Sequence, residues 1–160
     1  MLYDDELFQV KLDDHHPEYQ YVTFKRSSGH ENYEVVEVDT EKLIYYSDQD
    51  LEGYVLAPVE QWRKDKREGI FKFLAPPGPR ERIPEMPVIC FRVRKTVRCV
   101  RKWFLFKKYI VSNQRYIGYT NGRHRARYLH YAGAKRIPVM CHVTEVSALR
   151  TYCSNQRNNS

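Results

Sequence analysis

Basic residues follow a glycine closely at one point of the sequence, and together they could bind an anion. Gly122 is followed by Arg123, His124 and Arg125, and Arg127 comes two residues later. The pattern places them in the first turn of a helix, where unpaired N–H groups and the helix dipole favour negative charge. Glycine also allows a ligand to approach the backbone closely. Phosphate is the anion that we expect, and a solvated basic helix is the alternative reading.

The residues around this point predict a strand, a turn, a helix and a second strand. Residues 116–119 form a short stretch with two aromatic residues, which is typical of a strand. The sequence Thr-Asn-Gly at residues 120–122 predicts a turn. A helix is predicted over residues 123–132, with Gly133 as the residue that ends it. The second strand is predicted over residues 137–143.

The same residues resemble the phosphate-binding box of the ParB/sulfiredoxin superfamily. The run N-G-R-H-R-A-R at 121–127 is followed by A-G at 132–133 and I-P-V at 137–139, at the spacing of ParB-type members. Sulfiredoxins have G-C-H-R, and the His-Arg pair at 124–125 fits both patterns. Within the superfamily the chain is most similar to plasmid fertility inhibition factors. They share a T-N-G-R-H-R-A-R box and a similar tail, here residues 145–153.

The resemblance implies a fold, a ligand and a biological role. The fold would be α+β, with a small mixed sheet and flanking helices. The ligand would be a nucleoside triphosphate, ATP or CTP, with Mg²⁺ held by unknown metal ligands, and ATPase and DNase activity are implied. Such proteins are encoded on conjugative plasmids and block DNA export by a competing plasmid. The implied phosphate contacts are Asn121, Gly122, Arg123, His124, Arg125 and Arg127, and the implied catalytic residues are His124 and Arg125.

One position departs from both branches of the superfamily. Arg123 stands where sulfiredoxins have their nucleophilic cysteine and where ParB-type members have a glutamate. We therefore do not expect sulfinic-acid reductase activity, and the metal or nucleotide role of that glutamate does not carry over to this chain.

The net charge of +7 conceals a division along the chain. Residues 1–61 have a net charge of −11, and residues 62–160 have a net charge of +18. A part this basic predicts a polyanionic partner, either nucleic acid or an anionic membrane surface, with solubility alone as the alternative. The acidic part either flanks the basic turn and limits non-specific DNA binding or faces away from it.

Basic residues are interleaved with aromatic residues between residues 92 and 109. This pattern is typical of binding to single-stranded nucleic acid, and it also suits an anionic membrane surface. The third reading is a hydrophobic hairpin strand with basic ends, for which Phe104 and Phe106 would pack in the core. The residues expected to contact DNA are Arg92, Arg94, Arg98, Arg101, Lys102, Lys107 and Lys108.

The remaining elements suggest a single compact domain with two parts and a tail. An acidic, β-rich N-terminal extension covers residues 1–53, the ParB/sulfiredoxin-like core covers 54–153, and 154–160 form a frayed tail. The predicted strands are 8–12, 19–25, 33–38, 54–56 and 87–93, and the predicted helices begin at 39–40, at 58 (ending near 69) and at 143 (ending at 153). Proline marks 76–84 as a stiff loop.

Targeting signals and cysteine spacing bear on the compartment. No stretch reaches the roughly 20 apolar residues that a membrane-spanning helix needs. The first six residues are acidic and lack the features of a signal peptide. The four cysteines form no C-x-x-C pair, which predicts free thiols rather than a zinc site. We expect a cytoplasmic protein, with peripheral association at the inner membrane as the alternative.

Three functions remain open from the sequence. The first is a fertility-inhibition factor that binds nucleotide and transfer DNA and acts by ATPase or nuclease chemistry. The second is a non-catalytic DNA-binding module that nucleotide switches. The third is an inhibitor that docks on a component of a conjugation (type IV secretion) channel.

Overall fold

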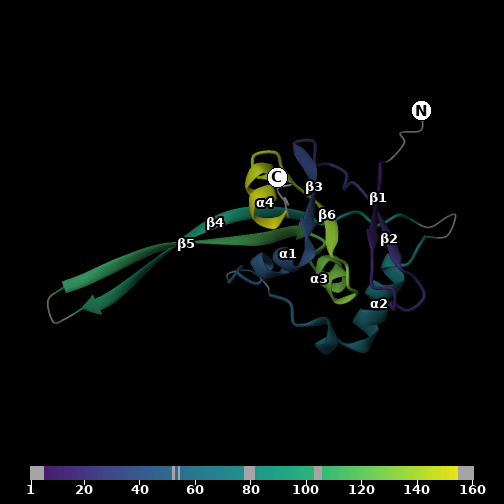
Figure 1. The fold of residues 1–160 in the computed structure, drawn as a ribbon, viewed down its shortest axis with the longest axis horizontal. Coiled ribbons are helices and arrows are strands. Elements are labelled where there is room, and N and C mark those ends of the chain that lie inside the picture. The colour runs from purple at the N-terminus through teal and green to yellow at the C-terminus, as the bar shows by residue number, and fades with distance from the viewer. Residues whose placement is uncertain (1–5, 52, 54, 78–81, 103–105, 155–160) are drawn as a thin grey trace, which may run out of the picture.

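The chain folds into two β-sheets with helices on their flanks, as the computed structural model shows (Figure 1). The structure describes residues 6–51, 53, 55–77, 82–102 and 106–154. The elements in chain order are β1 (Leu7–Lys11), β2 (Tyr21–Lys25), β3 (Tyr33–Asp39), α1 (Thr40–Ser47), the 3₁₀ helix η1 (Val59–Gln61), α2 (Lys64–Leu74), β4 (Val88–Lys102), β5 (Phe106–Asn121), α3 (Arg123–Tyr131), β6 (Arg136–His142) and α4 (Val146–Cys153).

The sheet topology confirms the predicted α+β class with a small mixed sheet. Strands β1 and β2 form an antiparallel pair, and the second sheet has the strand order β3-β6-β4-β5. In that sheet β3 runs antiparallel to β6, β6 runs parallel to β4, and β4 runs antiparallel to β5. Strand β3 pairs with β6 over its whole length, so the predicted N-terminal extension and the predicted core contribute to one sheet.

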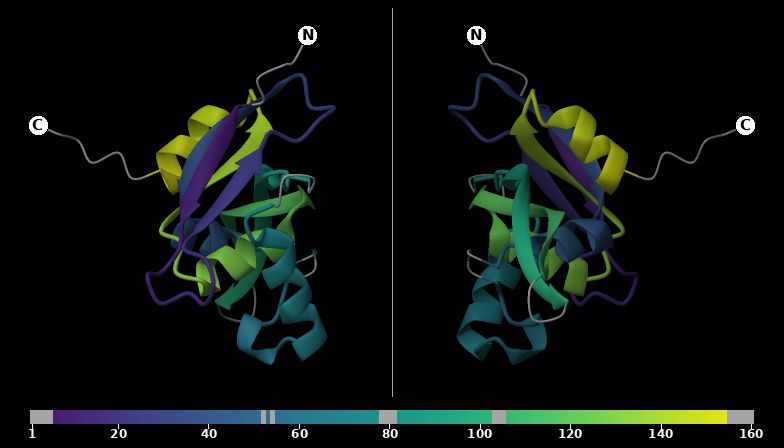
Figure 2. Two further views of the ribbon diagram at one scale, coloured as in Figure 1. Left: turned by 90° about the vertical axis from the view of Figure 1, so that its right-hand side faces the viewer. Right: turned by 90° about the vertical axis from the view of Figure 1, so that its left-hand side faces the viewer.

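The core lies where the helices cover the four-stranded sheet. Strand β6 is buried from Ile137 to Cys141 because it has a neighbouring strand on each side. Helix α1 packs against α3, β3 and β5, whereas α4 packs against β3. Helices α4 and α2 lie at opposite ends of the body (Figure 2). No helix among the described residues is long and apolar enough to cross a membrane.

Local signals explain where several helices begin and end. Asp39 caps α1, since its carboxylate accepts a hydrogen bond from the Lys42 amide at 3.0 Å. Gly133 follows α3 with φ of 85°, as predicted for the residue that ends this helix. In α4, Val146, Leu149 and Cys153 are buried, which confirms the predicted amphipathic tail helix.

The segment around residues 54–74 differs from its prediction. The predicted helix beginning at Pro58 is instead the short η1, and a separate helix α2 continues past Gly69 to Leu74. The glycine does not end the helix, because Leu74 is buried in the core and holds the next turn in place. Val55 and Leu56 belong to no strand, and Tyr54 lies outside the described residues.

Strands β4 and β5 are much longer than predicted and form a hairpin that projects from the body (Figure 1). We call its outer part the arm, namely Arg92–Lys102 of β4 paired with Phe106–Tyr116 of β5. Phe106 is 75% exposed, so its predicted packing in the core is wrong, and Phe104 lies outside the described residues. Strands β4 and β5 continue to pair with each other beyond the body of the molecule, so the body does not cover the Phe106 side chain.

The arm leaves the body where strand pairing to β6 stops. Among the described strands, β6 pairs with β4 at one position, Val88 opposite Met140. Three residues later, the amide of Phe91 donates to the carboxylate Oε1 of Glu145 at 2.7 Å. This side chain takes the place of a neighbouring strand and satisfies a donor that burial would otherwise leave unpaired.

Candidate functional site

Gly122 joins β5 to α3 by a tight turn that accepts only glycine. Its φ is 85°, and a Cβ at this position would lie 2.6 Å from the Cα of Pro87. Both the backbone conformation and the contact with Pro87 therefore exclude a side chain. Thr120 and Asn121, predicted as part of the turn, are instead the last residues of β5.

The N-terminus of α3 has neither a capping side chain nor an acidic residue in its first turn. The first turn consists of Arg123, His124 and Arg125, and its helical hydrogen bonds begin with the Ala126 amide, which donates to the Gly122 carbonyl at 2.9 Å. The dipole and the side chains therefore add positive charge at the same place, which favours a bound anion.

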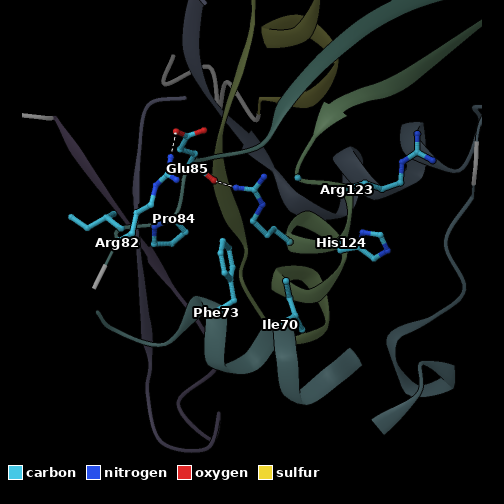
Figure 3. A pocket seen from close by; sticks show the side chains of 10 residues that line it. Ile70, Phe73, Arg82, Pro84, Glu85, Arg123 and His124 are labelled. Atoms are coloured by element: carbon cyan, nitrogen blue, oxygen red, sulfur yellow. Dashed lines mark hydrogen bonds and ion pairs between the residues drawn. The ribbon is translucent and has the colours of Figure 1, made fainter. Parts of the chain in front are cut away.

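A cavity of about 520 Å³ opens beside this turn (Figure 3). Three segments line it: α2, the loop before β4, and the start of α3. The lining residues are Ile70, Phe73, Arg82, Ile83, Pro84, Glu85, Gly122, Arg123, His124 and Arg125. The volume lies in the range of sites for small molecules, and the walls combine apolar side chains with cations.

Arg125 is held by acceptors on two segments. Its guanidinium donates to the carbonyl oxygen of Glu85 and, at 3.3 Å, to Oδ1 of Asn121. The same Oδ1 accepts from the Val88 amide at 3.2 Å, so Asn121 links α3 to the start of β4. Burial lowers the pKa of Arg125, and the nearby Glu85 partly opposes this shift. A partly desolvated cation of this kind gains from an anionic ligand.

Glu85 lies in the loop before β4, across the cavity from the start of α3, and its carboxylate is paired with other residues. Its Oε1 pairs with the Arg82 guanidinium at 3.2 Å, and its Oε2 accepts from the Ser27 hydroxyl at 2.9 Å. Among the described residues that line the cavity, it is the only carboxylate. In the described part of the chain, no group of three or more His, Cys, Asp and Glu side chains could hold a metal ion.

Arg123 and His124 leave the turn on the side away from Glu85 and Arg82 (Figure 3). The Arg123 guanidinium lies 5.6 Å from the ring centre of Tyr119, and the His124 ring lies 5.5 Å from that of Trp62. Burial, followed by the charges of nearby cations, lowers the pKa of His124. Its Nε2 is buried and has no hydrogen-bond partner among the residues that the structure describes. An ordered water or a polar ligand atom can satisfy a buried nitrogen of this kind.

Arg127 points elsewhere. Its guanidinium makes two hydrogen bonds to the carboxylate of Asp48, one of them at 3.3 Å, and it does not line the cavity. Asp48 follows α1, and Asp50 in the same turn pairs with Arg94 of the arm at 3.5 Å. The structure therefore brings Asn121, Gly122, Arg123, His124 and Arg125 together and places Arg127 in an ion pair with another element.

The residues expected to bind DNA all lie on the arm, away from the cavity. Arg92, Arg98, Arg101, Lys107 and Lys108 are exposed, whereas Arg94 is partly buried beside Asp50 and over the Tyr116 ring. Lys102 is in β4, and its side chain is outside the described part of the structure. The cavity and the arm are thus two separate basic surfaces.

The far wall of the cavity was not predicted. Ile70, Phe73, Arg82 and Glu85 come from segments about 40–50 residues before the glycine turn in the chain. The one local signal was the Arg-x-x-Glu spacing at 82–85, which is too common to indicate a site.

Two comparisons with known proteins bear on the chain, one on its family and one on its fold. Residues 35–154 match the family model described as plasmid fertility inhibition factor, so the match begins before the predicted core at residues 54–153. The chain also resembles the crystal structure of oncogenic suppression activity protein, a plasmid fertility inhibition factor, as its gold(I) cyanide derivative. The TM-score is 0.59 at 12% identity, covering 94% of this chain and 70% of that chain. No curated protein sequence matches the chain.

Proposed function

Because the chain belongs to the plasmid fertility inhibition factor family, we propose that it binds a nucleoside triphosphate and DNA and so blocks conjugative transfer of a competing plasmid. The nucleotide would occupy the cavity at the start of α3, and the DNA would contact the arm. The single observation that carries the proposal is the uncapped N-terminus of α3, whose first turn is entirely basic and opens into the cavity.

The donor set of the cavity fits a phosphate chain. The phosphates would lie against Gly122, Arg123 and His124, where the helix dipole and the unpartnered His124 Nε2 favour an acceptor. Ile70 and Phe73 on the opposite wall provide apolar surface for a base. Mg²⁺, if bound with the nucleotide, would supply charge neutralisation for the phosphates. Since Glu85 is the only carboxylate among the described lining residues, phosphate oxygens would hold most of that ion.

Two mechanisms fit the same site, and they differ in whether the nucleotide or the DNA is hydrolysed. In the first, the chain hydrolyses the nucleotide or cleaves DNA, with the Arg125 guanidinium stabilising negative charge as it develops and His124 hydrogen-bonding the phosphate. In the second, the nucleotide only switches DNA binding, as in a non-catalytic ParB-like module. Release of inorganic phosphate and nicking of labelled DNA, each measured with and without Mg²⁺, distinguish the two mechanisms.

Calorimetric titration of ATP and CTP tests the nucleotide site. We expect Arg123→Gln to weaken triphosphate binding by about 1.5–3 kcal/mol, the range for a hydrogen bond to a charged group. Arg125→Ala is a less clean variant, because it also removes the hydrogen bonds to Glu85 and Asn121. Lys72→Gln is the matched control, since Lys72 is exposed on α2 and does not line the cavity. Equal triphosphate affinities for the unmodified chain and Arg123→Gln would show that the nucleotide does not bind at this site.

Exposed apolar side chains on the arm favour a second candidate, an inhibitor that docks on a secretion-channel component. Val97 and Val111 face each other across the arm and are 63% and 62% exposed. Such a pair suits a protein surface as well as a nucleic acid. Protein docking through this pair would persist at high salt, whereas DNA binding would be lost as salt increases.

A further inference from the structure

We infer that the arm is a double-stranded DNA reader that lies in the major groove with one particular face toward the bases. This rests on the proposed function in so far as DNA is the partner. The inference adds which form of DNA is bound, which groove is used and which residues make the contact. It follows from the charge of the arm, its dimensions and the unequal chemistry of its two faces.

The charge of the arm is uniform in sign. Residues 92–115 contain nine Lys and Arg and no Asp or Glu, and the whole stretch 86–144 contains no acidic residue. A second copy of the arm is therefore a poor partner, because like charges would oppose each other along its length. A polyanion with regularly spaced charges is the complementary partner, and a nucleic acid has this property.

The dimensions of the arm match a groove of duplex DNA. Eleven register pairs, from Arg92–Tyr116 to Lys102–Phe106, make the ribbon. At roughly 3.4 Å per residue it is about 34 Å long, close to one turn of B-DNA. The major groove, about 12 Å wide, admits a two-stranded ribbon as it is, whereas the minor groove, about 6 Å wide, would have to be widened to accept one. Isolated ribbons also twist strongly to the right, which allows them to follow a helical groove.

The two faces of the arm differ, because directly opposed residues in an antiparallel pair share a face. The polar face carries Arg92, Arg94, Thr96, Arg98, Lys108, Ser112, Gln114 and Tyr116, together with Val100, Phe106 and Ile110 nearer the tip. The opposite face carries Val93, Lys95, Val97, Cys99, Arg101, Lys107, Tyr109, Val111, Asn113 and Arg115.

Base reading needs hydrogen-bonding side chains along the middle of the ribbon, and the polar face provides them. Its centre is the pair Thr96 and Ser112, whose hydroxyl oxygens lie 2.6 Å apart, and Arg98 is the next residue on the same strand and face. The centre of the opposite face is Val97 against Val111, which offers neither a donor nor an acceptor. Arginine, lysine, asparagine, glutamine and hydroxyl side chains read base edges in the major groove, and on the opposite face such residues lie only on either side of this central valine pair.

Aromatic spacing argues against single-stranded DNA as the main ligand. Binding to single strands uses neighbouring rings on which successive bases stack. Within the described part of the polar face, Tyr116 lies at the base of the arm and Phe106 near its tip, ten residues apart. The Arg94 guanidinium lies 4.6 Å from the centre of the Tyr116 ring and covers one face of it. The described arm thus lacks a continuous stacking surface.

Two matched double variants of the full chain test the choice of face. Arg98→Gln with Lys108→Gln removes one Arg and one Lys from the polar face, and Arg101→Gln with Lys107→Gln removes the same charges from the opposite face. All four residues are exposed. Fluorescence anisotropy would measure binding to a labelled duplex of about 30 base pairs, roughly three turns, and to its single strand over a range of salt concentrations.

We expect the duplex to bind more tightly than the single strand. The polar-face double variant should lose about tenfold or more in duplex affinity, as expected for arginine at base edges. The opposite-face double variant should lose less than about threefold in duplex affinity. Its arm should stay folded, since the two substitutions remove the repulsion between two cations that are directly opposed. In the unmodified complex, guanine N7 atoms, which lie in the major groove, should be protected from dimethyl sulfate.

The outcomes separate this inference from the proposed function. Equal losses in the two double variants, preference for the single strand or unprotected guanine N7 atoms would overturn the groove assignment and leave DNA binding intact. Absence of binding to either DNA form at low salt would overturn both. Thermal melts of both double variants establish that the comparison is made between folded proteins.

Discussion

The partly buried ring of His124 makes the stability of the chain depend on pH. Burial lowers its pKa below the ordinary value of 6.5, so the unfolded chain takes up a proton before the folded chain does. The free energy of unfolding should therefore fall as the pH drops below about 6.5 and recover as it rises through that value. We expect His124→Gln to flatten this part of the profile.

Urea denaturation at a series of pH values from about 5 to 8 measures this dependence. The other histidines are present in both proteins, so the difference between the two profiles belongs to His124. Parallel profiles would show that the folded and unfolded chains protonate this ring alike.

At the residue scale, the sequence indicates a role for a residue better than it indicates the partner. Gly122 was predicted as a turn residue, and its positive φ confirms the turn, whereas the phosphate site stays a prediction. The contact with Pro87, which excludes a side chain just as strongly, could not be read from the sequence. Arg127 shows the same limit, because its partner Asp48 lies 79 residues away and only the tertiary fold brings the two together.

At the scale of elements, Glu145 is the side chain that ends the pairing of β4 within the body. Glu145→Ala would leave the Phe91 amide without its acceptor, and Phe91 is buried. We expect the free energy of unfolding to fall by about 1–3 kcal/mol. Glu145→Gln keeps an oxygen at the same place and should cost much less.

Chemical denaturation measures both variants, and hydrogen exchange at the Phe91 amide reports the local effect. Similar losses in the two variants would mean that the charge of Glu145, rather than the hydrogen bond, stabilises this junction. An unaffected Glu145→Ala variant would mean that water replaces the acceptor.

Elements with one buried face were predicted well, and the arm was not. Strands β3 and β6 and helices α3 and α4 each carry a regular apolar pattern or a clear end signal, and their predicted positions are confirmed within a few residues. In the arm both faces meet solvent, so alternation of apolar and polar residues is lost and only the basic composition stands out. The cavity likewise needed α2 and the loop before β4, which no local pattern connects to α3.

At the scale of the molecule, the acidic strand β3 and the hairpin strand β5 lie at opposite edges of the four-stranded sheet. Glu34 is exposed on β3, whereas Asp50 lies against Arg94 at the base of the arm. We therefore expect Glu34→Gln to leave duplex affinity unchanged at low salt. Asp50→Asn should raise the affinity, because it releases the charge of Arg94, and the gain should shrink as salt screens that charge.

Each of these two variants removes one negative charge, so net charge alone predicts the same effect for both. Anisotropy titrations at low and moderate salt make the comparison. Equal gains would show that the acidic surface acts through total charge, and a larger gain for Glu34→Gln would place the DNA path near β3.

Two contacts, Glu145 with Phe91 and Asp50 with Arg94, lie at the base of the arm. The ribbon beyond them is a lever of about 34 Å, so a rotation of roughly 10° at the base carries the tip about 6 Å, nearly two residue steps of a strand. A small change of angle at these two side-chain contacts therefore produces a large change in the position of the tip of the arm.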